Sequence, residues 1–193
     1  MLLAAGGSSR LGRAKQLTTL QGETLVRRSA RMSLGLTSSV LVVTGAKQRE
    51  VELELEDLPV KLVENPRWRE GIGNSIAEGI GKVPVGANAV LIMLCDQYRI
   101  SRNDLRSLVA AWQKEPDHIA VARWGKQFGS PAVFPRSLFV ALSRLTGDHG
   151  ARQLLVQQRA RLNFVDLPAA AYDLDDAVDL ARLRRFEASL SGN

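Results

Sequence analysis

The sequence predicts an α/β protein in which a mostly parallel sheet lies between two layers of helices, a three-layer α/β/α sandwich. Short runs rich in Val, Ile and Leu alternate along the chain with segments whose apolar residues recur about every 3.6 positions. The short runs are apolar at consecutive positions, as expected for strands that helices cover on both faces. The chain has 193 residues, of which 45% are hydrophobic and 24% charged. We therefore expect one compact domain over residues 1–193.

Six segments have the composition of buried strands. Each is a short apolar run, and Gly, Pro or polar residues interrupt the chain between them. The run that ends at Leu94 is expected near the centre of the sheet. In chain order, the predicted strands are Leu2–Ala4, Val40–Thr44, Val60–Val63, Ala89–Leu94, Ile119–Ala122 and Asn163–Asp166.

Seven segments have helical periodicity. In the segment that begins at Arg102, for example, Leu105, Leu108, Val109 and Trp112 fall on one face of a helix. Strand and helix therefore take turns along the chain, which favours parallel strands joined by helical crossovers. The predicted helices are Thr24–Ser33, Gln48–Leu55, Ser75–Ile80, Arg102–Gln113, Ser137–Leu142, Ala151–Arg159 and Ala177–Ala188.

The loop after the first predicted strand is rich in groups that bind phosphate. Glycines let backbone amides approach phosphate oxygens, serine hydroxyls donate hydrogen bonds, and Arg10 and Lys15 supply positive charge. A P-loop is excluded, because Arg13 and Ala14 follow Gly12 where Lys and Ser or Thr are required, and the dinucleotide pattern G-x-G-x-x-G is absent. The residues predicted to bind nucleotide here are Leu3, Ala4, Ala5, Gly6, Gly7, Ser8, Ser9, Arg10 and Lys15.

The pattern L-A-A-G-x-S-x-R-x-G-x-x-K, read from Leu3 to Lys15, resembles the signature of the nucleotidyltransferases that make molybdenum cofactor dinucleotides. It is also similar to the wider group of sugar and isoprenoid nucleotidylyltransferases. The resemblance implies a Rossmann-like fold of the nucleotide-diphospho-sugar transferase type. The alternative interpretation is an ordinary Gly/Ser-rich turn beside two surface cations.

Asp96 follows the apolar run that ends at Leu94 and Cys95. A carboxylate at the exit of a buried strand needs a cationic partner, and Mg²⁺ beside phosphates is a suitable one. The alternative is an Asp that caps a helix or closes a turn. The resemblance agrees with the metal, because its members carry L-C-D-Q-P with the Asp as a Mg²⁺ ligand. This chain has Tyr98 where that Pro is expected.

Residues 65–76 resemble the family segment N-P-x-W-x-x-G-[ML]-x-x-S, so Asn65 and Ser75 are predicted to bind nucleotide. A loop that delivers Ser75 to the start of a helix brings a hydroxyl and unpaired amides to one place. The alternative is that Ser75 only caps the helix.

Two further segments resemble the acceptor side of the family. Gly129 and Pro131 fit G-x-P-x-x-F and are expected to shape a rigid turn, while residues 147–152 fit G-D-x-G-A-R. Asp148 is expected to cap a helix and His149 to be an exposed turn residue. The residues predicted to bind the acceptor substrate are Gln97, Gly129, Pro131 and Arg152.

The acidic segment 173–176 precedes the last predicted helix and is similar to the family segment D-I-D-T-P-E-D-L, with Asp176-Ala177 in place of Thr-Pro. Acids in this position complement the positive end of the helix dipole. Opposite the first loop they can also supply a second Mg²⁺ ligand, for which we expect Asp175 rather than Asp173.

L-A-A-G, C-D-Q and G-D-x-G-A-R together are most similar to the molybdenum cofactor cytidylyltransferases. The resemblance implies transfer of CMP from CTP to a molybdopterin-type cofactor with release of pyrophosphate, with Mg²⁺ as cofactor and Arg10, Lys15 and Asp96 as catalytic residues. It also implies transient contact with a molybdenum hydroxylase or its maturation factor. The alternatives are a guanylyltransferase, a transferase for sugar or isoprenoid phosphates, and a noncatalytic protein that binds or delivers the cofactor.

The net charge of +6 favours anionic ligands. A nucleic-acid-binding domain is a weaker alternative, because the Lys and Arg residues are scattered. The single Cys95 is expected to be a packed thiol, and the two histidines lack zinc-site spacing. Since no apolar run approaches about 20 residues and no signal peptide is recognisable, we expect a cytoplasmic protein that binds no membrane.

Overall fold

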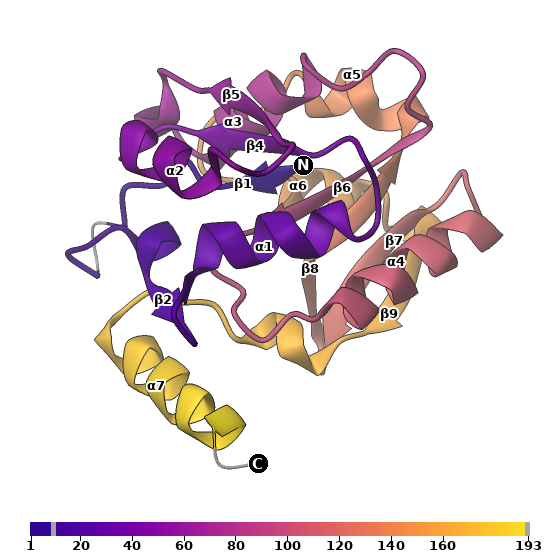
Figure 1. The fold of residues 1–193 in the computed structure, drawn as a ribbon. Helices are drawn as coiled ribbons and strands as arrows, with labels where there is room; N and C mark the ends of the chain where they lie inside the picture. The colour runs from indigo at the N-terminus through magenta and orange to yellow at the C-terminus, as the bar shows by residue number, and fades with distance from the viewer. Residues whose placement is uncertain (9–10, 192–193) are drawn as a thin grey trace.

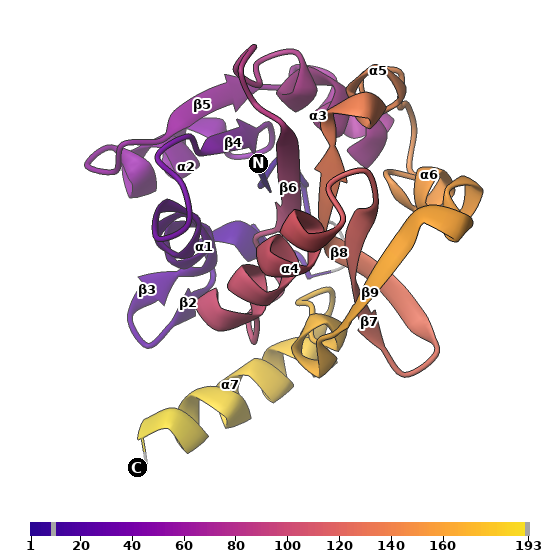
Figure 2. The same cartoon turned by 90° about the vertical axis from the view of Figure 1, so that its right-hand side faces the viewer.

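The computed structural model describes residues 1–8 and 11–191, and it confirms the three-layer α/β architecture. One sheet of seven strands, in the order β5-β4-β1-β6-β8-β7-β9, lies between two groups of helices (Figures 1 and 2). The strands of this sheet are β1 (Leu2–Leu3), β4 (Leu41–Thr44), β5 (Lys61–Glu64), β6 (Ala89–Leu94), β7 (Ile119–Trp124), β8 (Gln127–Pro135) and β9 (Leu162–Asp166).

The sheet is mostly parallel. Strand β1 pairs in parallel with β4 on one side, where Leu2 lies opposite Val42, and with β6 on the other, where Leu2 lies opposite Met93. Only β8 among these seven strands runs the other way, antiparallel to both β6 and β7. The carboxyl ends of β1 and β6 therefore meet at the same edge of the sheet, which is where α/β proteins bind ligands.

Each face of the sheet has its own hydrophobic core. Leu2 packs in the cluster under α1, α2 and α4, while its neighbour Leu3 packs in the cluster under α3, α5 and α6. This alternation follows from the two-residue period of a strand. The helices are α1 (Leu25–Leu34), α2 (Gln48–Leu55), α3 (Ile72–Ile80), α4 (Arg102–Lys114), α5 (Phe139–Leu142), α6 (Arg152–Gln157) and α7 (Ala177–Ser191).

Strand β8 corrects the prediction of a rigid turn around Gly129 and Pro131, since both residues lie inside a nine-residue strand. On β7, Val121 pairs with Ala132 and Ala122 pairs with Gly129, so Ser130 and Pro131 form an irregularity without partners on that strand. Proline has no N–H to donate to a ladder, and glycine weakens a strand, so both are tolerated at a bulge. Gly129 and Pro131, which predicted a turn, therefore lie at a bulge in a strand.

A third cluster joins the C-terminal helix to a short hairpin that the sequence did not reveal. The hairpin consists of β2 (Thr19–Leu20) and β3 (Glu23–Thr24), and both residues of its turn, Gln21 and Gly22, have positive φ. Figures 1 and 2 show α7 beside this hairpin, apart from the main sheet. The buried members of the cluster are Leu20, Leu25, Tyr98, Leu174 and Leu183.

No helix within the described residues combines the length and the apolar composition needed to cross a membrane.

Helix α7 contributes Leu183, which is fully buried, to the third cluster. We predict that Leu183→Ala lowers the free energy of unfolding by about 2–5 kcal/mol, because it removes buried methyl groups and leaves a cavity. The control is Val178→Ala on the same helix, where the side chain is 59% exposed and the expected change is within about 0.5 kcal/mol. Urea denaturation measures both variants, and equal effects would show that α7 is not docked in this way.

Candidate active site

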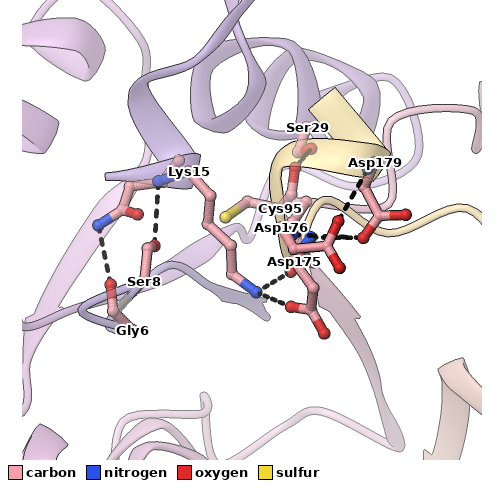
Figure 3. Close-up of polar contacts among 10 residues, drawn as sticks. Gly6, Ser8, Lys15, Ser29, Cys95, Asp175, Asp176 and Asp179 are labelled. Atoms are coloured by element: carbon pink, nitrogen blue, oxygen red, sulfur yellow. Dashed lines mark hydrogen bonds and ion pairs between the residues drawn. The ribbon is translucent and has the colours of Figure 1, made fainter. Parts of the chain in front are cut away.

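The predicted phosphate loop lies at the carboxyl end of β1 and is fastened at several points. The backbone amide of Ala46 donates to the carbonyl of Ala5 at 3.0 Å. The side-chain amide of Gln16, which is 1% exposed, donates to the carbonyls of Gly6 and Ala46, both at 3.2 Å. Where the loop ends, Ser8 Oγ accepts a hydrogen bond of 3.0 Å from the amide of Lys15 (Figure 3). The predicted site residues Ser9 and Arg10 lie outside the described residues.

Lys15 joins the loop to the two carboxylates predicted from distant parts of the sequence. Its Nζ forms an ion pair with Asp96 Oδ2. The same atom lies 3.0 Å from Asp175 Oδ1 (Figure 3). Burial alone lowers the pKa of Lys15, but the charges and hydrogen bonds of Asp96 and Asp175 outweigh burial and raise the pKa above its ordinary value. The lysine is therefore a firmly charged ammonium group between two carboxylates.

Asp96 lies just beyond the end of β6, where the sheet meets the loop. The residue is 3% exposed, and its Oδ1 has no hydrogen-bond partner in the described part of the chain. Its neighbour Cys95 is buried, as predicted, and burial together with the Asp96 charge raises the pKa of the thiol above its ordinary value. Cys95 is thus a packed thiol, while Asp96 retains one oxygen that can accept a ligand.

Asp175 is held in place by the cap of α7. The side chain of Asp176 accepts hydrogen bonds from the amides of Val178 and Asp179, and Asp179 Oδ2 in turn accepts from the amides of Asp175 and Asp176. This exchange between a cap residue and the third helical residue is a capping box. The expected complement to the helix dipole therefore comes from Asp176 and Asp179, while the Asp175 carboxylate reaches Lys15.

The third hydrophobic cluster contains residues close in sequence to both Asp96 and Asp175, and so helps to position both carboxylates. Tyr98 comes two residues after Asp96, and Leu174 comes directly before Asp175; both are buried in the cluster. The Tyr98 ring lies 5.8 Å from that of Phe186 on α7, measured between ring centroids. Tyr98, which replaces the expected Pro, thus helps dock α7 beside the end of β6.

A cavity of about 480 Å³ opens beside this ion cluster. The loop, the end of β6 and the start of α3 form its walls, and no histidine is among its lining residues. These are Leu3, Ala4, Ala5, Gly6, Gly7, Lys15, Gln16, Trp68, Arg69, Gly71, Ile72, Ser75, Leu94, Cys95, Asp96 and Asp148.

Ser75 lies on the cavity wall, but it does not cap the helix. Helix α3 begins at Ile72, three residues earlier than predicted, and its cap position is Gly71. Asn65 is fully buried, and its Nδ2 donates to Ser75 Oγ at 2.9 Å, while its Oδ1 accepts from the amide of Arg67. Asn65 therefore orients Ser75 and does not itself line the cavity.

The residues predicted to bind the acceptor lie outside the walls of this cavity. The Gln97 amide donates to the carbonyls of Ser130 and Ala170, at 2.8 and 3.1 Å, and so fastens the irregular part of β8. Arg152 is exposed at the start of α6. For Gln97, Gly129, Pro131 and Arg152, contact with substrate stays a prediction.

Asp148 and His149 precede α6. The cap position of that helix is Ala151, so the expectation that Asp148 caps it was wrong; Asp148 lines the cavity instead. His149 is exposed, as predicted.

Trp68 and Arg69 also line the cavity, although neither was predicted to belong to the site. A Cβ atom placed on Gly7 would lie 2.7 Å from the Trp68 ring, and one on Gly45 would lie 2.7 Å from Trp68 Cβ. The Arg69 guanidinium stacks on the indole, 4.4 Å from its centroid. The sequence segment N-P-x-W-x-x-G contains Trp68, and this tryptophan could have indicated a contact with the loop.

The donor set fits Mg²⁺. No group of three or more His, Cys, Asp or Glu residues that could hold a metal occurs in residues 1–8 and 11–191. Asp96 has a buried oxygen without a partner, and Asp175 lies across Lys15 from it. Mg²⁺ in nucleotide sites is held by one or two carboxylates together with phosphate oxygens and water. Two carboxylates are therefore sufficient if a triphosphate supplies the remaining ligands.

Comparison with known proteins shows the family of this chain. Residues 1–162 match the MobA-like NTP transferase domain. The chain belongs to this family. It is 32% identical over 168 residues to the purine catabolism protein PucB of Bacillus subtilis, which covers 80% of this chain and 78% of PucB. The protein is accordingly of the nucleotidyltransferase type.

Solved structures share the fold over almost the whole length. A homologue of Rv0371c from Mycobacterium sp. strain JC1 is 27% identical with a TM-score of 0.84, covering 98% of this chain and 96% of that one. Rv0371c of Mycobacterium tuberculosis is 27% identical with a TM-score of 0.78, over 95% and 96% of the two chains. A second structure of Rv0371c, in complex with manganese, has 24% identity and a TM-score of 0.76, over 94% and 95% of the chains.

The contact between Gly7 and Trp68 predicts a difference between two adjacent glycines. Gly7→Ala forces the new methyl group into the indole and should lower the free energy of unfolding by about 1–3 kcal/mol. For Gly6→Ala, no described atom beyond the adjacent residues lies within 4 Å of the new Cβ, and the expected change is within about 0.5 kcal/mol. Urea denaturation compares the two, and the same loss in both would contradict the packing of Trp68 against the loop.

Proposed function

We propose that this protein transfers CMP from CTP to the terminal phosphate of a molybdopterin-type cofactor and releases pyrophosphate. The observation that carries the proposal is the meeting of the loop, Lys15, Asp96 and Asp175 at one end of the sheet, beside a cavity of about 480 Å³. A flexible ammonium group and two carboxylates form a site for a metal-bound triphosphate, and membership of the MobA-like family supports this use.

The reaction needs charge stabilisation and positioning more than proton transfer. The acceptor phosphate is already an anion and attacks the α-phosphate of CTP in line, so the absence of a histidine from the residues that line the cavity is consistent with it. Amides of residues 6–8 and the ammonium of Lys15 stabilise negative charge on the departing pyrophosphate. Arg10 is assigned the same role from the sequence.

Asp96 and Asp175 are the residues that would hold Mg²⁺, which would supply positive charge shared by the triphosphate and the acceptor phosphate. The manganese complex of Rv0371c supports the use of a divalent cation. The position of Asp96 at the rigid end of β6 orients its carboxylate without a further hydrogen bond to Oδ1.

The choice of CTP rests on the L-A-A-G segment. The cytidylyltransferases that the chain resembles have alanine at the third position of this segment, and Ala5 is among the residues that line the cavity. The similarity to PucB supports a product that serves an enzyme of purine catabolism, and the proposed partner is a molybdenum hydroxylase or its maturation factor.

The proposal is tested by measuring pyrophosphate release with each of the four NTPs, Mg²⁺ and purified molybdopterin. We expect CTP to have the highest kcat/KM and omission of molybdopterin to stop release. In Ala5→Gly the preference for CTP over GTP should narrow, because the substitution removes the residue on which the choice of CTP rests. If GTP is preferred, or if a sugar or isoprenoid phosphate replaces molybdopterin as acceptor, the proposed substrates are wrong.

Asp96→Ala should lower kcat for pyrophosphate release by at least about 100-fold, since Lys15 loses its buried partner and the cation loses a ligand. Circular dichroism checks that the fold is kept. The control is Asp57→Ala, which removes an exposed carboxylate paired with Arg27 outside the cavity and should leave kcat unchanged. Turnover at the unmodified rate in Asp96→Ala would remove this residue from the mechanism.

A further inference from the structure

The ammonium group of Lys15 lies between the two carboxylates to which the proposed function assigns a metal ion. It pairs with Asp96 Oδ2 and lies 3.0 Å from Asp175 Oδ1. The Asp96 side chain is only 4% exposed, whereas that of Lys15 is 23% exposed along the cavity. A carboxylate buried to this degree needs a positive partner, and Lys15 is the partner that the structure provides.

A divalent cation held by both carboxylates is incompatible with this position of the ammonium group. Mg²⁺ binds oxygen ligands at about 2.1 Å, so even an ion on Asp96 Oδ1, the oxygen without a partner, would lie a few ångströms from the ammonium group that is paired with Oδ2. Like charges at such a separation repel each other, and the repulsion is stronger beside a buried carboxylate than in bulk water. The cation and the lysine therefore compete for one place.

The Lys15 side chain can move away from the carboxylates without a change in the backbone of the loop. The amide of Lys15 donates to Ser8 Oγ, which fixes the backbone at the end of the loop. The side chain beyond it is a flexible four-carbon stem, and it lines the same cavity as the loop amides of Gly6 and Gly7. A triphosphate in that cavity offers the displaced ammonium new anionic partners.

We propose that, in the free protein, the Lys15 ammonium group neutralises the carboxylates of the metal site. When a divalent cation binds there, it displaces the ammonium group, which then binds the triphosphate. Metal and triphosphate then bind cooperatively, because either one alone leaves a charge without a partner. The proposal deepens the nucleotidyltransferase function and rests on its triphosphate site, but it holds for any base and any acceptor.

The test uses Mn²⁺ alone, with no nucleotide, and follows free Mn²⁺ by electron paramagnetic resonance. Lys15→Met removes the competing cation and should tighten Mn²⁺ binding by about tenfold or more relative to the unmodified protein. The matched control is Lys47→Met, which removes one positive charge from an exposed pair with Glu50 outside the cavity and should change the affinity by less than about twofold.

Asp175→Asn identifies the site that is titrated. Added to Lys15→Met, it should abolish the gain in Mn²⁺ affinity, because the ion loses one carboxylate. Mn²⁺ binding to Lys15→Met that is equal to or weaker than binding to the unmodified protein overturns the proposal.

A second measurement needs no substitution and so does not depend on the folding of a variant. Reductive methylation of Lys15, followed by mass spectrometry of its peptide, should be slow in the free protein and several-fold faster with saturating Mg²⁺ alone. Addition of CTP should slow it again as the ammonium group binds phosphate. A rate that does not respond to Mg²⁺ contradicts the displacement.

Both measurements separate this inference from the proposed function. Neither Mn²⁺ affinity nor the effect of Mg²⁺ on methylation depends on CTP preference or on molybdopterin, so either result stands if another base or acceptor is used. Conversely, the proposed cytidylyl transfer does not require that Lys15 and the cation compete.

Discussion

The ion cluster of Lys15, Asp96 and Asp175 is the interaction on which the rest of this site depends. It joins three segments that are far apart in the sequence: the end of the first loop, the end of β6 and the cap of α7. Asp96 is buried, so without a positive partner its charge would oppose folding of the central strand's end. The ion pairs of the cluster therefore hold the predicted phosphate loop, the end of the sheet and the start of the C-terminal helix together.

Most strands and helices of the three layers could be predicted from the sequence, because apolar runs and helical periodicity are local patterns. Strand β6 has the predicted bounds Ala89–Leu94, and α2 has the predicted bounds Gln48–Leu55. Strand β8 was missed because Gly129 and Pro131 are turn residues locally, and only pairing with β6 and β7 makes a strand of their segment. The hairpin of β2 and β3 escaped because each of its strands has only two residues. Its stability comes from packing against α7, which no local pattern reveals.

The candidate site was predictable where one residue type has a distinctive chemistry. Lys15 and Asp96 were predicted from charge and motif, and Asp175 was expected as a second metal ligand. The structure brings the three together, while metal binding by Asp96 and Asp175 stays a prediction. The roles of Trp68 and Asn65 depend on packing across elements: Trp68 presses on Gly7, and Asn65 orients Ser75 from a buried position. Such contacts become visible only when β5 and α3 are placed beside the loop.

The measurement closest to the central claim is a crystal structure with CTP and Mn²⁺, in which anomalous scattering locates the ion. We expect one manganese peak bound by the carboxylates of Asp96 and Asp175, with Lys15 Nζ on phosphate oxygens of the nucleotide. A peak elsewhere, with Lys15 still paired to Asp96, would contradict it.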